Sequence, residues 1–177
     1  METKDKFRVL VIDDEKEIIH GFKLAFENEW EVEGITHPDE LKNDMKGGFR
    51  KFQLFDLIFL DLLFDARMQV TQQNVVDKIT RGDLLGIQFL DWLGKNYSCP
   101  VVVLSGFLFD AVTEKLQAAY PYLLLKPKPV DLYAREFQGN MEHYARTFYR
   151  FKREMLFDRP AEELLRKFDE AMGKKPS

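Results

Sequence analysis

The sequence predicts an α/β protein in which a doubly wound parallel sheet carries helices on both faces. Five short apolar segments alternate with segments whose apolar residues recur at helical spacing. One segment, residues 54–61, is continuously apolar except for Asp56 until it ends at Asp61, which is typical of a strand buried on both faces of a parallel sheet. The chain has 177 residues, of which 45% are hydrophobic, so it can bury a full core.

The expected strands are short and most are rich in β-branched or aromatic residues. They are residues 7–12, 30–35, 54–61, 100–105 and 122–125. The helices expected between them are residues 15–28, residues 38–46, a segment that begins near Gly86, and residues 109–119. Because strands and helices alternate, the connections are expected to be right-handed crossovers between parallel strands.

Composition and charge exclude several classes of protein. The net charge is -4 and the pI is about 5.5, so the chain lacks the basic character that nucleic-acid binding usually requires. No apolar stretch reaches the roughly 18 residues of a membrane span, and the first residues lack the apolar core of a signal peptide. The single cysteine, Cys99, gives no disulfide framework. These features predict a cytoplasmic protein with no membrane or nucleic-acid partner.

Polar residues stand at the carboxyl ends of four expected strands. Asp13 and Asp14 follow the first strand, Asp61 ends the third, Ser105 ends the fourth, and Lys126 follows the fifth. In a parallel sheet these ends share one edge, so the side chains are expected to meet in space. Three carboxylates would repel one another unless a cation joined them, and oxygen ligands suit Mg²⁺. A nearby lysine and hydroxyl can bind phosphoryl oxygens, and Asp61 can be the nucleophile that accepts a phosphoryl group.

Each of these residues also has a purely structural interpretation. Asp14 with Glu17 three residues later matches a capping box at the start of the first helix. Ser105 before Gly106 matches an ordinary turn. The segment Lys126-Pro127-Lys128-Pro129 matches a rigid linker. The functional interpretation depends on all of these residues occurring in order at successive strand ends.

Together the motifs resemble the receiver domain of two-component response regulators. They are VLVIDDE with Asp13 and Asp14, DLIFLDL with Asp61, VVVLSG with Ser105, and LLLKP with Lys126. The resemblance covers the chain from about Lys6 to the start of the last helices. It implies a flavodoxin-like fold whose five parallel strands lie in the order 2-1-3-4-5.

The resemblance also implies a function. Receivers accept a phosphoryl group on an aspartate, here Asp61, from a histidine kinase or a phosphotransfer protein. The residues implied for Mg²⁺ are Asp13, Asp14, Asp61 and the backbone carbonyl of Leu63, and those implied for catalysis are Asp61, Ser105 and Lys126. The chain is therefore expected to be a signalling protein, with only intrinsic self-phosphorylation and self-dephosphorylation, rather than an enzyme.

The sequence departs from the receiver pattern in three places. Within a receiver domain assigned to residues 1–130, residues 64–85 form an insertion, interpreted either as a lid or docking segment or as an insertion with no specific role. Leu123 stands where receivers often carry a switch aromatic. Leu63 and Phe107 are apolar at positions where receivers tune hydrolysis, which predicts slow self-dephosphorylation.

Residues 131–177 are expected to form a helical extension. From Tyr133 to Met155 apolar residues recur every three or four positions, which predicts one helix of about six turns. A second helix is expected near residues 160–172. The apolar stripe of the long helix is interpreted either as packing within the chain, in a helical hairpin, or as the surface of a homodimer. The extension is too short for a separate output domain, so output is expected through protein contacts.

Two classes of function compete. The first is the phosphorylatable switch with Asp61 as acceptor. The second is a scaffold or pseudo-receiver, whose acids serve structure and whose output depends on the insertion and the terminal helices. A phosphatase with an aspartate nucleophile is disfavoured, because the haloacid-dehalogenase pattern requires an acid two residues after the nucleophile, where this chain has Leu63.

Overall fold

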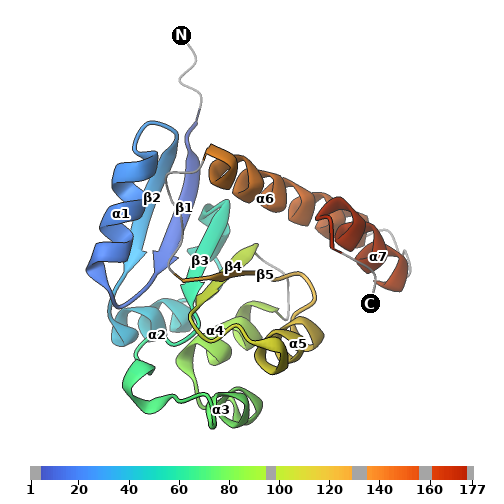
Figure 1. Ribbon diagram of the computed structural model, residues 1–177. Helices are drawn as coiled ribbons and strands as arrows, with labels where there is room; N and C mark the ends of the chain where they lie inside the picture. The colour runs from blue at the N-terminus through green and yellow to red at the C-terminus, as the bar shows by residue number, and fades with distance from the viewer. Residues whose placement is uncertain (1–4, 95–98, 129–134, 156–160, 175–177) are drawn as a thin grey trace.

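The computed structural model describes residues 5–94, 99–128, 135–155 and 161–174 (Figure 1). Five strands form a single parallel sheet, as the sequence pattern predicted, in the order β2-β1-β3-β4-β5 that the resemblance to receiver domains implied. The strands are β1 (Phe7–Ile12), β2 (Trp30–Ile35), β3 (Leu57–Asp61), β4 (Val101–Ser105) and β5 (Leu124–Pro127).

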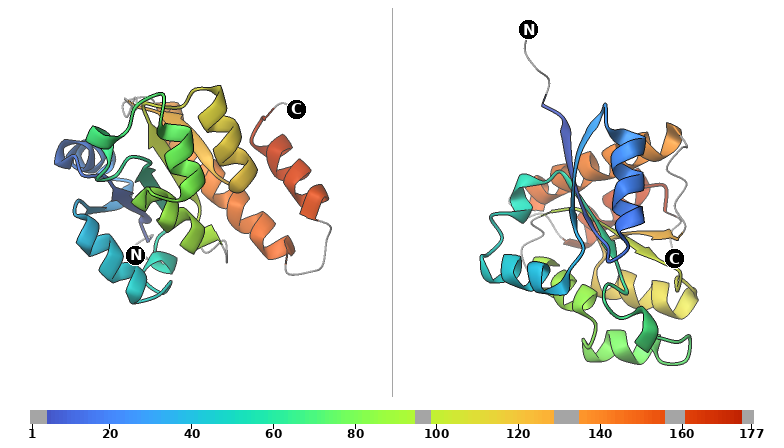
Figure 2. Two further views of the ribbon diagram at one scale, coloured as in Figure 1. Left: turned by 90° about the horizontal axis from the view of Figure 1, so that it is seen from below. Right: turned by 90° about the vertical axis from the view of Figure 1, so that its left-hand side faces the viewer.

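Helices cover both faces of this sheet (Figures 1 and 2). Against one face lie α2 (Pro38–Lys46), α4 (Leu85–Gly94) and α5 (Asp110–Ala119), and we call the core they bury the α4-side core. Against the other lie α1 (Lys16–Phe26), α6 (Arg135–Met155) and α7 (Ala161–Ala171), which bury the α6-side core. No helix in the described ranges has both the length and the apolar character needed to cross a membrane.

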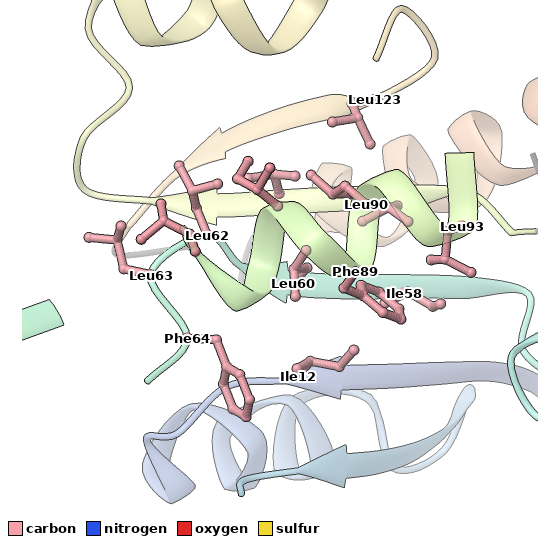
Figure 3. Close-up of a cluster of buried hydrophobic side chains, with 14 of the residues drawn as sticks. Ile12, Ile58, Leu60, Leu62, Leu63, Phe64, Phe89, Leu90, Leu93 and Leu123 are labelled. Atoms are coloured by element: carbon pink, nitrogen blue, oxygen red, sulfur yellow. The ribbon is translucent and has the colours of Figure 1, made fainter. Parts of the chain in front are cut away.

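The central strand β3 contributes to both cores because successive side chains of a strand point to opposite faces. Leu57 and Phe59 lie in the α6-side core, whereas Ile58 and Leu60 lie in the α4-side core, where Phe89 of α4 packs nearby (Figure 3). All four β3 residues are fully buried. The expectation of a strand covered on both faces is therefore confirmed.

The insertion at residues 64–85 is part of the folded core. It contains the 3-10 helix η2 (Arg67–Gln69) and a short helix α3 (Val75–Arg81), which the sequence analysis did not predict. Phe64, Val75 and Ile79 are buried in the α4-side core, and α3 contacts α5. Gly82 ends α3 with a φ of 69°, a backbone conformation that glycine adopts without steric cost. The insertion thus has a fixed backbone next to the end of β3.

The apolar stripe of the long helix packs within the chain. Phe137, Met141, Tyr144, Phe148 and Phe151 are buried in the α6-side core. Helix α7 folds back along α6 and adds Leu164 and Phe168 to the same core, so the hairpin interpretation describes the structure (Figure 1). Tyr133, the side chain of Met155 and the expected boundary at residues 130–131 lie outside what the structure describes.

Helix α6 is fastened along the amino-terminal edge of the sheet. The Tyr144 hydroxyl lies within hydrogen-bond distance of two carbonyl oxygens, 3.0 Å from that of Val101 and 2.5 Å from that of Tyr122. The Tyr149 hydroxyl donates to the carbonyl of Phe55 at 3.1 Å, and Trp30 Nε1 donates to Glu142 Oε1 at 3.0 Å. These bonds hold the extension at the edge opposite to the carboxyl ends of the strands.

We expect Tyr144→Phe to lower the free energy of unfolding by about 1–2 kcal/mol, because it removes the one hydroxyl donor that the Val101 and Tyr122 carbonyls share. Tyr149→Phe is the matched control, since its hydroxyl is less buried and serves one carbonyl. Urea unfolding of both variants measures the difference. An unchanged free energy of unfolding in the Tyr144→Phe variant would show that this hydroxyl does not hold α6 in place.

Candidate functional site

The acidic residues meet at the carboxyl edge of the sheet. Strands β1 and β3 are neighbours with Ile12 opposite Leu60, so Asp13 comes next to Asp61. One oxygen from each of Asp13, Asp14 and Asp61 lies within 4.8 Å of the others. The predicted convergence of these three carboxylates is therefore present in the structure.

A shared turn orients the polar side chain at three strand ends. In each, the side-chain oxygen accepts a hydrogen bond from the backbone N–H two residues later, a turn typical of Asp and Ser. Glu15 N lies 2.9 Å from Asp13 Oδ1, and Leu63 N lies 3.1 Å from Asp61 Oδ1. Phe107 N lies 3.0 Å from Ser105 Oγ. These turns leave the Oδ2 atoms of Asp13 and Asp61 for other partners.

Asp14 does not cap the first helix. Helix α1 is capped by Glu15, whose side chain makes no capping hydrogen bond, so the alternative of an Asp14 capping box is wrong. The Asp14 side chain is 30% exposed and contacts the guanidinium of Arg67. Its carboxylate belongs to the acidic cluster.

The ammonium in the cluster comes from Lys128, not from the predicted Lys126. Lys128 Nζ lies 2.6 Å from Asp13 Oδ2 and 3.2 Å from Asp61 Oδ2. Lys126 lies within β5 opposite Leu104, and among the described residues it forms no ion pair. Two residues are one full period of a strand, so both lysines share a face, and Lys128 lies about 6–7 Å further toward the carboxyl edge. The position three residues before this lysine is then Leu125, which is also not aromatic.

A second cation reaches the cluster from the insertion. The Arg67 guanidinium contacts Asp14 and Glu15, and one of its nitrogens lies 3.7 Å from Asp13 Oδ1 and 3.6 Å from Asp61 Oδ2. The sequence analysis did not identify Arg67. The available signal was an arginine only six residues after Asp61, within a segment that follows directly from the third strand.

The other two predicted residues, Ser105 and Leu63, lie at the same edge of the sheet. Ser105 is 1% exposed at the end of β4, and its carbonyl accepts a hydrogen bond from Lys128 N at 3.1 Å. The Leu63 carbonyl accepts a hydrogen bond from Ala66 N at 2.8 Å, which leaves one lone pair for a further partner. Its role as a metal ligand remains a prediction.

Burial makes this cluster costly for negative charge. The pKa of Asp61 is raised to about 6, mainly by burial; Lys128 acts to lower it and the neighbouring Asp13 acts to raise it. The pKa of Asp13 is also raised by burial, against the opposing effects of Lys128 and Arg67. Burial therefore makes the ionised form of both carboxyls costly, and more positive charge nearby would reduce that cost.

The donor set fits a hard divalent cation. Asp61 Oδ2 is buried and accepts no hydrogen bond from any described residue; Lys128 meets it only as an ion pair. Three carboxylates that offer oxygen atoms alone are the ligands that Mg²⁺ prefers. Asp13, Asp14 and Asp61 are therefore the residues that would hold the ion.

Solved structures share this architecture, although no protein-family model and no curated protein sequence matches the chain. A CheY-like response regulator receiver domain from Methanospirillum hungatei JF-1 superposes with a TM-score of 0.56 at 17% identity, over 82% of this chain and 98% of that one. The beryllofluoride-activated NtrC4 receiver domain gives 0.54 at 22% identity, over 80% and 98%. The chain has the fold of a response-regulator receiver domain. A structure titled adenylate cyclase from Rhodopirellula baltica is also similar, with a TM-score of 0.50 at 15% identity, over 88% and 100%.

In this receiver fold, Gly86 of α4 sets how closely the helix approaches the site. A Cβ atom at this position would lie 2.7 Å from the Leu62 carbonyl oxygen and 3.4 Å from that of Asp61. Both oxygens belong to the backbone, which cannot move aside as a flexible side chain can. Only glycine lets α4 pack directly against the residues that position the Asp61 carboxylate.

We expect Gly86→Ala to lower the free energy of unfolding by about 1–3 kcal/mol through this overpacking. Gly139→Ala in α6 is the control, because its Cβ would meet no atom within 4 Å. That change should stabilise the helix by up to about 1 kcal/mol. Urea unfolding of the two variants should therefore shift in opposite directions, and a neutral Gly86→Ala would contradict the packing argument.

Proposed function

We propose that this chain is a phosphorylatable receiver switch that accepts a phosphoryl group on Asp61 from a histidine kinase or a phosphotransfer protein. The observation that carries the proposal is the buried Asp61 Oδ2, which accepts no hydrogen bond in the described structure and faces Lys128 beside two further carboxylates. A purely structural aspartate would be expected to have both oxygens hydrogen-bonded.

The chemistry follows from the positions of these groups. The ionised Asp61 attacks the phosphorus of a phosphohistidine, a P–O bond forms, the P–N bond breaks, and the imidazole leaves. Lys128, 3.2 Å from Asp61 Oδ2, neutralises charge on the transferred group. Mg²⁺ bound by Asp13, Asp14 and Asp61 would supply further positive charge for the phosphoryl oxygens. Ser105 lies at the end of the neighbouring strand, where a hydroxyl can bind the transferred group after a small movement.

Output through protein contacts fits the arrangement of the surface. Helices α6 and α7 use their apolar residues inside the chain, whereas the insertion carries Met68, which is 99% exposed. The insertion also joins the site to α5 through α3. Residues 1–130 would then form the receiver, with 64–85 as a docking segment. Slow self-dephosphorylation, predicted from Leu63 and Phe107, belongs to the same proposal.

One observation favours the competing scaffold function. Arg67 already supplies positive charge to the acidic cluster, as an internal substitute for a metal ion would. A pseudo-receiver with a permanently seated Arg67 would accept neither Mg²⁺ nor a phosphoryl group. The next experiment separates the two functions.

Beryllofluoride, which mimics the phosphoryl group, should bind in the presence of Mg²⁺. At a hundred times its Kd it should raise the Tm by about 5–10 °C, as expected for ligand binding to a chain of this size. Asp61→Asn should abolish the increase, whereas Asp77→Asn, an exposed acid of α3, should retain it. No increase in the wild-type chain would favour the scaffold.

The two lysines should differ in the same assay. Lys128→Gln removes the ammonium at the carboxylates and should weaken beryllofluoride binding by at least about tenfold. Lys126→Gln removes an equal charge from β5 and should change binding by less than about twofold, because a more distant, solvent-screened charge contributes little. Equal effects of the two substitutions would show that the distance of a lysine from Asp61 does not decide its contribution to beryllofluoride binding.

A further inference from the structure

We infer that Arg67 competes with the divalent cation for the acidic cluster, so that the insertion sets the affinity of the site for metal. This inference rests on the proposed function, in which the cluster binds Mg²⁺. In the structure described above, the guanidinium occupies the side of the cluster from which Asp14, Asp13 and Asp61 would hold the ion. Because the guanidinium and the ion would approach these carboxylates from the same side, binding of one excludes the other.

The contacts of Arg67 divide between its two terminal nitrogens. One nitrogen contacts Glu15, and the other contacts Asp14 and lies 3.6–3.7 Å from the buried Asp13 and Asp61. Arg67 therefore approaches every carboxylate of the cluster, while Lys128 approaches only the two buried ones among the described residues. A planar guanidinium with several donors suits this arrangement better than a compact ammonium does.

The backbone that carries Arg67 is fixed by its neighbours. Ala66 is buried and donates its N–H to Leu63 at 2.8 Å, and Gln69 donates to Ala66 at 3.0 Å. Asp65 has a φ of 62°, a left-handed conformation that Asp tolerates better than most residues, and it turns the chain back toward the cluster. A folded segment, and not a loop without structure, thus holds the arginine beside the carboxylates.

Charge favours the divalent ion once Arg67 has left. Asp13, Asp14 and Asp61 carry three negative charges, and Lys128 and Arg67 together supply two positive ones. Lys128 with a divalent cation would neutralise all three. The apparent metal affinity then equals the intrinsic affinity multiplied by the fraction of molecules in which Arg67 has left the cluster.

The test is the Mg²⁺ affinity of the wild-type chain and of Arg67→Gln, measured by calorimetric titration. Arg67→Gln should bind Mg²⁺ about tenfold more tightly, which corresponds to an arginine seated in about nine molecules of ten. Arg81→Gln removes the same charge from an exposed position at the end of α3, and Met68→Ala alters the exposed neighbour of Arg67. Both controls should bind as the wild-type chain does, within about twofold.

Thermal unfolding gives a second readout that is independent of titration. Without metal, Arg67→Gln should have a lower Tm than the wild-type chain, because the three carboxylates lose a counter-charge, and Mg²⁺ should raise its Tm more than that of the wild-type chain. Equal or weaker Mg²⁺ binding by Arg67→Gln would overturn the inference and leave the proposed function intact. Absence of Mg²⁺ binding in both chains would overturn the proposed function as well.

Discussion

The burial of two carboxylates on adjacent strands is the constraint on which this site depends. Asp13 and Asp61 are 0% and 2% exposed, and ions taken out of water are stable only when charges and hydrogen bonds compensate them. The strand-end turns satisfy one oxygen of each, and Lys128 approaches the other. Arg67 adds charge from the insertion. The carboxyl edge of the sheet is thus arranged around negative charge that the rest of the chain must balance.

The sequence was sufficient for the sheet and for the acids of the site. Strands such as Val101–Ser105 are short, apolar runs bounded by polar or proline residues, and their alternation with helical spacing allowed few topologies. Parallel strands bring their carboxyl ends to one edge, so Asp13, Asp14 and Asp61 could be placed together from the strand ends alone. These predictions depended on local pattern and on the geometry of parallel sheets.

The predictions that were wrong or missing depended on contacts distant in sequence. Two Lys-Pro pairs occur in succession at the end of the last strand, and only the register of β5 against β4 shows that Lys128 reaches Asp13. Helix α3 has a largely polar sequence, and Val75 and Ile79 become core residues only because α4 and α5 lie beside them. Arg67 belongs to no recognisable sequence motif. Its role depends on the turn at Asp65, which the hydrophobic pattern does not encode.

The closure of the α6-side core has a consequence for biosynthesis. Val9, Phe22, Phe59 and Val102 are covered partly by α6 and α7, which follow all five strands in the chain. Translation adds about 5–20 residues each second, so a nascent chain would expose this aromatic face for seconds after the strands have left the ribosome. The fold is therefore completed after most of the chain has been made, although the acidic cluster at the carboxyl edge of the sheet comes entirely from the earlier part.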